Sequence, residues 1–211
     1  MQWQDQGIVL SVRRFGESAI ILDLLTSRHG RHSGLVRGGR SKRLRATLQP
    51  GNTLDVNWRA RLEDHLGNFS VELATPRAAL IMDDPAALAG LSSFCALCHL
   101  LSERESHDNL YSASSLLLDS LPHDEHWPAL MVRWELGLLS ALGFGLDLSR
   151  CAATGAKEDL IYVSPRTGRA VSRKAGLDYA DKLLKLPAFL SGSKTGYPNE
   201  KDLSEAFALS S

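Results

Sequence analysis

The chain has 211 residues, of which 44% are hydrophobic, and its 24 basic residues balance its 24 acidic ones. This size fits one large globular domain or two small ones with a real core. No run of about 18 apolar residues predicts a membrane-spanning helix, the N-terminus lacks a secretory signal, and three cysteines argue against a disulfide framework. We therefore expect a cytoplasmic protein without a membrane partner.

The first 75 residues alternate between apolar and polar side chains, the pattern of half-buried strands. In residues 52–62, Leu54, Val56 and Trp58 share one face. Strands are also predicted over residues 7–15, 18–26, 31–38 and 68–75, with a long loop over residues 40–51. Five short antiparallel strands with one apolar face favour closure into a small barrel, either OB-type or SH3-like.

After Pro76 the apolar residues recur at three- and four-residue steps, which predicts helices. Helices are expected over residues 88–101, 110–121, 127–142 and 177–190, and again from Glu200. Residues 147–175 are rich in polar residues and glycine and are expected to be irregular. The chain is therefore α+β, with a small barrel followed by an all-helical domain.

The zero net charge hides an asymmetry between the two parts of the chain. Residues 1–80 carry 12 Lys and Arg against 7 Asp and Glu, and residues 81–211 carry 12 against 17. Between Arg28 and Arg45 there are seven basic residues and no acidic one. A segment of this kind predicts that the first part of the chain binds a polyanion.

The basic segment is the strongest candidate for nucleic-acid binding, because cationic side chains that neutralise phosphates release condensed counterions. Glycines in Gly38-Gly39 would let the backbone approach a ligand closely. Arg59 and Arg61 share the polar face of a neighbouring strand, and Arg13 and Arg14 point to opposite faces, so that at most one joins the patch. The predicted nucleic-acid-binding residues are Arg31, Arg37, Arg40, Lys42, Arg43, Arg45, Arg59 and Arg61.

Aromatic side chains that could stack on bases are few in the predicted barrel. Trp58 and Phe69 are in phase with core residues, which leaves His29 and His32 as the exposed candidates. Backbone contacts are therefore expected to dominate, with weak sequence preference.

Neither a metal site nor a catalytic site is predicted. Cys95 and Cys98 lie on an apolar helical stripe and Cys151 has no neighbouring cysteine, whereas a structural zinc site needs about four ligands. The sequence contains no phosphate-binding loop, nucleophile elbow or HExxH motif. Acidic pairs at Asp83-Asp84 and Asp124-Glu125 fit solvated loops or helix caps better than a nuclease site. We expect a protein that is not an enzyme and has no cofactor.

A second basic cluster lies in the last third of the chain. Its members could bind an acidic protein segment or more DNA, and a mixed solvated face explains them equally well. These residues are Arg166, Arg169, Arg173, Lys174, Lys182 and Lys185.

Several segments together resemble one family. GIVLSVRRFGESAIILDLLTSRHGRHSGLVRGGRSKR followed by LQPGN is similar to the N-terminal part of RecO, a bacterial DNA-repair protein, and LGFGLDLSRCAATG with YVSPRTGRAVS is similar to its central region. The resemblance extends from about residue 3 to the end. It implies an N-terminal five-stranded OB-fold β-barrel that binds DNA over residues 1–78. A helical C-terminal domain would follow over residues 79–211, with an irregular insert at about 147–175.

The resemblance also implies a function, partners and an association with the nucleoid. A protein of this family would act as a recombination mediator that binds single- and double-stranded DNA and anneals complementary strands. With RecR it would help to load RecA on DNA coated by single-stranded-DNA-binding protein, whose acidic C-terminal tail it would contact. The alternative from another class is a protein-interaction adaptor whose barrel docks an acidic protein without annealing DNA.

Two departures from the family pattern modify these expectations. Of the four-cysteine zinc site that some members carry, only Cys151 remains, so zinc is not expected. Family members also continue into a longer final helix than SEAFALSS provides, which predicts that part of this helix is missing here.

Overall fold

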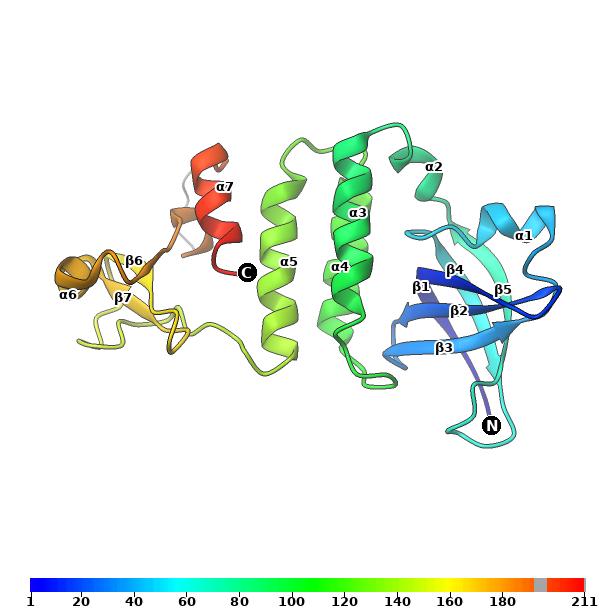
Figure 1. Cartoon of the computed structure of the whole chain (residues 1–211). Coiled ribbons are helices and arrows are strands. Elements are labelled where there is room, and N and C mark those ends of the chain that lie inside the picture. Colours follow the sequence, from blue (N-terminus) through cyan, green and yellow to red (C-terminus); the bar gives the residue numbers. More distant parts are fainter. Residues whose placement is uncertain (192–196, 211) are drawn as a thin grey trace. The chain divides into compact units, whose positions relative to one another are not determined.

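The structure is a computed structural model that describes residues 1–191 and 197–210 (Figure 1). The chain forms two compact units, Met1–Asp124 and Glu125–Ser211. The first contains the predicted barrel together with four helices, and the second contains the remaining helices and a small sheet.

The N-terminal strands close into the expected barrel. Its strands are β1 (Gln2–Phe15), β2 (Ala19–Thr26), β3 (Arg31–Val36), β4 (Thr53–Arg59) and β5 (Asn68–Thr75). They follow the order β1-β2-β3-β5-β4 around the barrel, with β3 and β5 parallel and every other pair antiparallel. Closure pairs strand edges that would otherwise be open to aggregation. The α+β prediction with a five-stranded N-terminal barrel is confirmed.

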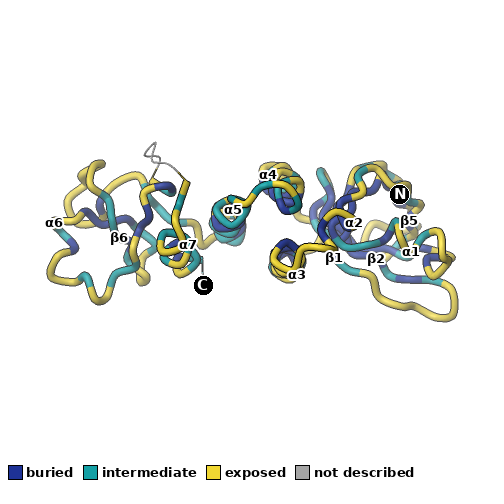
Figure 2. Tube along the Cα trace, turned by 90° about the horizontal axis from the view of Figure 1, so that it is seen from above, coloured by how far each residue is buried: buried dark blue, intermediate teal, exposed yellow. Residues whose placement is uncertain are grey.

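The barrel core is built from the inward-facing residues of the alternating pattern. It contains Leu22, Leu54 and Trp58, all at most 1% exposed, with the Phe69 ring packed beside them. A Cβ atom at Gly34 would lie 2.4 Å from the Phe69 ring, so glycine makes room for this aromatic side chain. Figure 2 shows buried backbone in the barrel strands and mostly exposed backbone around the segment between β3 and β4.

The expected loop between β3 and β4 contains a short helix, α1 (Lys42–Thr47). Ser41 caps it, because its side chain accepts a hydrogen bond from the Leu44 backbone N–H at 3.4 Å. Leu44 and the buried Leu48 pack against the barrel core. Two leucines among basic residues give too weak a pattern to predict a helix, and the prediction of a loop throughout residues 40–51 was wrong.

Three helices complete the first unit: α2 (Ala78–Ile81), α3 (Pro85–Cys98) and α4 (Asp108–Ser120). The buried Arg77, just before α2, joins them to the barrel: its guanidinium donates to Asp119 Oδ1 at 2.6 Å and to Thr53 Oγ1. The predicted domain boundary at residue 78 follows β5, whereas these contacts place α2, α3 and α4 in one compact unit with the barrel.

The segment between α3 and α4, residues 99–107, packs against the turn between β2 and β3. The Arg104 backbone N–H donates to Arg31 O at 2.8 Å, and its guanidinium donates to the backbone oxygens of Glu63, Asp64 and His65. This part of the first unit therefore covers one end of the barrel and holds the β4–β5 loop.

The second unit combines helices with a small sheet. Its elements are α5 (Trp127–Ala141), β6 (Leu160–Val163), β7 (Ala170–Ser172), α6 (Arg173–Gly176), β8 (Leu184–Lys185) and α7 (Glu200–Phe207), with 3₁₀ turns at Leu177–Tyr179 and Ala188–Leu190. The sheet has the order β7-β6-β8. Asn199 and Asp202 form a capping box at α7. The helices predicted from residues 127 and 200 are confirmed.

Two predictions in this unit were wrong. Residues 147–175 are not irregular throughout, because β6 and β7 form a hairpin that buries Tyr162 and Val163. Residues 177–190 do not form one helix, because Lys185 pairs with Tyr162 in the sheet and Pro187 cannot continue a helix. The spacing of the leucines in this stretch fits both the 3.6-residue period of a helix and the two-residue period of a strand.

In the part of the chain that the structure describes, no helix has the length and apolar character needed to cross a membrane.

Candidate nucleic-acid interface

The fold divides the basic segment of residues 28–45 between the two ends of the barrel strands. Arg28 and Arg31 lie at the turn between β2 and β3, whereas the remaining members follow β3 and continue into α1. Together with two arginines from neighbouring strands, the second group forms a surface that we call the basic cap. Its members are Arg14, Arg37, Arg40, Lys42, Arg43, Arg45 and Arg59, all exposed.

One groove of the basic cap lies between the β1–β2 hairpin and the start of α1. Its volume is about 780 Å³, and Arg14, Arg40 and Arg45 line it together with Gly38 and Gly39. The Arg40 guanidinium donates to the backbone oxygen of Glu17, which is the acidic residue of this groove. Since Gly38 has φ +66° and no neighbour within 4 Å of a built Cβ, the backbone here is accessible to a ligand.

A second groove, of about 610 Å³, runs across β3, β5 and β4 beside α1. Arg37 and Arg59 line it together with the polar side chains of Asn57, Asn68 and Ser70. The Arg59 guanidinium donates to Gln2 Oε1 at 2.9 Å, a neutral partner that leaves its charge uncompensated. Arginines and amides in one groove provide donors suited to phosphate oxygens.

The helix α1 separates the two grooves, since Arg45 lines the first and Leu44 lines the second. Lys42 and Arg43 are exposed on its first turn. Among described residues, no ion pair involves any member of the basic cap. Unpaired cations around two grooves produce the positive potential that attracts a polyanion. Arg61 lies in the exposed β4–β5 loop and lines neither groove.

Arg31 differs from the other predicted nucleic-acid-binding residues because its charge is already paired. Its side chain is 16% exposed and its guanidinium lies 3.2 Å from Asp23 Oδ2, while Nε donates to Leu101 O at 3.0 Å. Burial raises the pKa of Asp23, against the attraction of Arg31. Because its guanidinium is bound to Asp23 in the barrel and to the backbone of Leu101, Arg31 joins the barrel to residues 99–107. We therefore leave it out of the basic cap.

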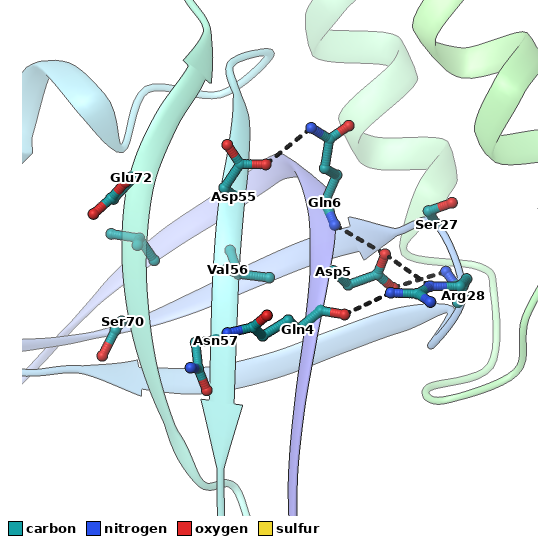
Figure 3. A pocket seen from close by; sticks show the side chains of 11 residues that line it. Gln4, Asp5, Gln6, Ser27, Arg28, Asp55, Val56, Asn57, Ser70 and Glu72 are labelled. Atoms are coloured by element: carbon teal, nitrogen blue, oxygen red, sulfur yellow. Dashed lines mark hydrogen bonds and ion pairs between the residues drawn. The ribbon is translucent and has the colours of Figure 1, made fainter.

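Figure 3 shows a pocket of different character on β1, β4, β5 and the β2–β3 turn, with a volume of about 650 Å³. Three carboxylates line it, from Asp5, Asp55 and Glu72, against the single guanidinium of Arg28. Arg28 lies 3.5 Å from Asp5 Oδ1 and donates to Gln4 O at 2.7 Å. An excess of carboxylates repels phosphate, so this pocket does not extend the basic cap.

The two histidines expected to stack on bases occupy other positions. His32 is 3% exposed within a cluster of Trp3, Trp58 and Phe69, and the prediction that it is exposed was wrong. Burial lowers its pKa to about 4. The ring of His29 is stacked on Trp3 at 4.0 Å between centroids, and its Nδ1 lies 2.8 Å from Asp5 Oδ2. One face of His29 is therefore already covered.

In the second unit, half of the predicted partner-binding cluster is engaged within the chain. Arg169 lies 3.4 Å from Asp147, Arg173 lies 3.2 Å from Asp159, and Lys185 Nζ lies 4.4 Å from the centroid of the Tyr162 ring. The other three members, Arg166, Lys174 and Lys182, are exposed. No ion pair between described residues involves these three.

None of the three cysteines lines either groove of the basic cap. Burial raises the pKa of Cys95 to about 12 and that of Cys98 well above its usual value, so both thiols stay protonated. Cys151 is buried and its Sγ accepts a hydrogen bond from the Ser172 N–H at 3.3 Å. Among the described residues, no three His, Cys, Asp or Glu side chains form a cluster that could hold a metal.

Sequence reasoning did not assign Arg14 to the interface. Strand alternation places Arg13 and Arg14 on opposite faces, and only the closed barrel shows which face meets α1. Paired residues point to the same face of a sheet, and Arg14 pairs with Ile20, whose side chain is in the barrel core. Arg14 is at the end of β1, where this face opens to the surface, and it lines the first groove together with Ile20.

Comparisons with known proteins agree with this architecture. The family model described as "Recombination protein O N terminal" matches residues 1–77, and the one described as "Recombination protein O C terminal" matches residues 82–210. The first range ends just after β5 and the second begins at the end of α2.

Curated relatives match along nearly the whole chain. The DNA repair protein RecO of Chelativorans sp. (strain BNC1) is 52% identical over 209 residues, which cover 99% of this chain and 84% of the relative. DNA repair protein RecO of Sinorhizobium medicae (strain WSM419) is 49% identical over 209 residues, which cover 99% of this chain and 84% of the relative. The chain therefore belongs to the RecO family of DNA repair and recombination proteins.

Proposed function

We propose that this protein is a DNA-binding recombination mediator that holds single- and double-stranded DNA on its basic cap and anneals complementary strands. With RecR it would help to load RecA on DNA coated by single-stranded-DNA-binding protein. Its part in the reaction is binding and positioning without bond-breaking chemistry.

The observation that carries this proposal is the basic cap itself, seven exposed cations around two grooves. Each phosphate that such a cation neutralises releases condensed counterions, a contribution that is independent of base sequence. A mediator needs this property, because it acts wherever damage occurs.

Annealing follows from the same electrostatics. Two complementary strands repel each other through their phosphates, and a cationic surface that holds both lowers this repulsion and raises their local concentration. Base pairing then supplies the sequence recognition. Exposed glycine backbone at Gly38 beside the first groove allows close approach of a strand.

The second unit provides a candidate surface for the acidic tail of single-stranded-DNA-binding protein. Arg166, Lys174 and Lys182 are the members of the C-terminal basic cluster that have neither an ion pair nor a cation–π contact among the described residues. Free cations of this kind suit an acidic peptide. Arg169, Arg173 and Lys185 would contribute less, since their partners are intramolecular.

The test is a salt titration of oligonucleotide binding together with an annealing assay. If six cap residues contact phosphates, log K should fall against log salt with a slope of about −4 for single strands and about −5 for duplexes. Labelled complementary oligonucleotides, bare or coated by single-stranded-DNA-binding protein, should anneal faster with the protein at low salt than without it. A flat salt dependence, or no acceleration of annealing, contradicts the proposal. Retention of an acidic protein on the barrel without annealing would instead identify an adaptor.

A further inference from the structure

A row of outward-facing residues crosses the barrel beside the basic cap. Paired positions connect it from strand to strand: Arg13 opposite Ile21, Ile21 opposite Leu35, Leu35 beside Asn68, and Asn68 opposite Arg59. The row spans five strands, or four steps of about 4.8 Å, roughly 19 Å in all. It has an arginine at each end and an aliphatic pair in the middle.

Phe15 lies beside the β1 end of this row. It is two residues after Arg13 on the same face of β1 and pairs with Ala19 on β2. Its ring is 51% exposed at the start of the β1–β2 turn, and the core clusters do not include it. Ile21 and Leu35 are half-buried. An exposed Phe by itself is ordinary, but here it lies on the same outer face as the apolar pair Ile21 and Leu35 and beside Arg13.

The other end of the same outer face is not available to a ligand. The adjacent row contains Asp23 and Ser33, where His99 Nδ1 lies 3.2 Å from Asp23 Oδ2 and Ser33 Oγ lies 3.5 Å from Glu103 Oε1. Segment 99–107 therefore covers this end, and the open part of the face begins at Arg13, Ile21 and Leu35.

We propose that Phe15, with Ile21 and Leu35, forms a platform for unstacked bases of single-stranded DNA, whose phosphates are held by Arg13 and Arg59. This inference rests on the DNA-binding function proposed above and deepens it. The platform accepts bases only from a single strand, because duplex bases are already stacked on each other. The Phe15 side chain would therefore give the protein a preference for single strands over duplex DNA.

Charge favours a nucleic acid over an apolar protein segment as the occupant. Arg13 and Arg59 are exposed and take part in no ion pair among described residues. Arg59 also lines the second groove of the basic cap, so a strand on the platform continues onto a phosphate-binding surface. Proteins that bind single strands combine these two features, a basic track and aromatic or apolar platforms for bases.

The experiment is a double-mutant cycle in which the Phe15 ring is removed from the protein and the bases are removed from the DNA. Affinities of the full-length protein and of Phe15→Ala are measured for an oligothymidylate, an abasic strand of equal length, and a duplex, at one salt concentration. We expect Phe15→Ala to bind oligothymidylate about tenfold more weakly, and the abasic strand and the duplex with unchanged affinity. Phe15→Trp should retain the wild-type preference for bases. The matched control is Phe144→Ala, which removes a 72% exposed phenyl ring in the second unit and should change nothing.

The outcomes separate this inference from the proposed function. An equal loss on the oligothymidylate and the abasic strand, or no loss on either, overturns the platform while DNA binding by the basic cap stands. The salt slope of Phe15→Ala should equal that of the wild type, since no phosphate contact is removed. If the wild type binds none of the three ligands, the proposed function itself fails. Unchanged thermal unfolding of Phe15→Ala excludes a folding defect.

Discussion

The two ends of the barrel strands both carry basic residues but use them differently. At the β2–β3 turn, Arg28 and Arg31 are paired with Asp5 and Asp23, and residues 99–107 pack over this turn. At the other end, the members of the basic cap have no carboxylate partners among the described residues. A charge becomes available to a ligand only where the fold leaves it unpaired, so the first end stabilises the unit and the second is suited to bind DNA.

The largest expected effect comes from reversing charge at the open end. Arg40→Glu, Lys42→Glu and Arg43→Glu together should weaken binding to single-stranded DNA on the order of a thousandfold and make the salt slope shallower by about 2. Unfolding should be almost unchanged, because all three residues are exposed and two of the new carboxylates lie in the first turn of α1. Fluorescence anisotropy over a salt series measures both quantities.

A matched triple variant controls for net charge. Arg150→Glu, Lys157→Glu and Lys201→Glu change three exposed residues of the second unit by the same total charge. This variant should keep most of the affinity. An equal loss in both variants would mean that long-range charge, and not contact with the basic cap, controls binding.

At the β2–β3 turn, where the basic residues are paired with carboxylates, a substitution should change the stability of the protein and not its affinity for DNA. Arg31→Leu removes the guanidinium that compensates the buried Asp23 carboxylate, and should lower the free energy of unfolding by about 3 kcal/mol at pH 7. The pKa of Asp23 is already raised by burial, so its ionised form costs stability above that pKa and the cost disappears as pH falls. The deficit of the variant should therefore shrink between pH 7 and pH 5.

A second substitution checks the cause of this loss. Asp23→Asn combined with Arg31→Leu removes both charges and should recover stability at pH 7 in urea titrations. DNA affinity of each folded variant should stay within about twofold of the wild type, because Arg31 is 16% exposed and already bound to protein atoms. A large loss of affinity in folded Arg31→Leu would place Arg31 in the interface.

The sequence predicts the barrel well because its strands follow one simple rule. Alternation over residues 52–62 places Leu54, Val56 and Trp58 in the core, as observed. The rule fails for His32, whose inward neighbours along β3 are Gly34 and Val36. Since glycine has no side chain, the apolar face of β3 is not visible in the sequence, and a buried histidine could be mistaken for an exposed one.

The division of the basic segment could not be predicted from the sequence. The residues that pair its first members, Asp5, Asp23 and Glu103, come from β1, β2 and the segment after α3. Contacts over such separations depend on the tertiary fold. The composition therefore identifies a candidate polyanion site but not which of its arginines are free.

Alanine substitutions at two glycines, one at each end of the barrel strands, test how tightly each end is packed. Gly30 and Gly16 both have positive φ, at +64° and +63°, so alanine costs about 1 kcal/mol at either position. A Cβ at Gly30 would lie 2.1 Å from the Glu105 carbonyl oxygen, whereas none of the neighbours of Gly16 lies within 4 Å. Gly30→Ala should therefore destabilise by about 2 kcal/mol more than Gly16→Ala in chemical denaturation. Equal losses would show that residues 99–107 do not pack tightly on the turn.

The smallest effect concerns His32, which lies in the aromatic cluster below the paired end. Its two ring nitrogens lack hydrogen-bond partners among described residues, and burial lowers its pKa to about 4 from 6.5. Protonation therefore favours the unfolded chain, so this histidine weakens the fold as pH falls from about 6.5 towards 4. Between pH 7 and pH 5 the loss should be about 1–2 kcal/mol.

His32→Leu removes this titration while keeping a side chain of similar size among Trp3, Trp58 and Phe69. The variant should be at least as stable as the wild type at pH 7, because two buried polar atoms without partners are lost. Its advantage should then grow as pH falls, in urea titrations at pH 7 and pH 5. A constant difference at both pH values would mean that the pKa of His32 is the same in the folded and the unfolded protein, and that other groups cause the acid sensitivity of the barrel.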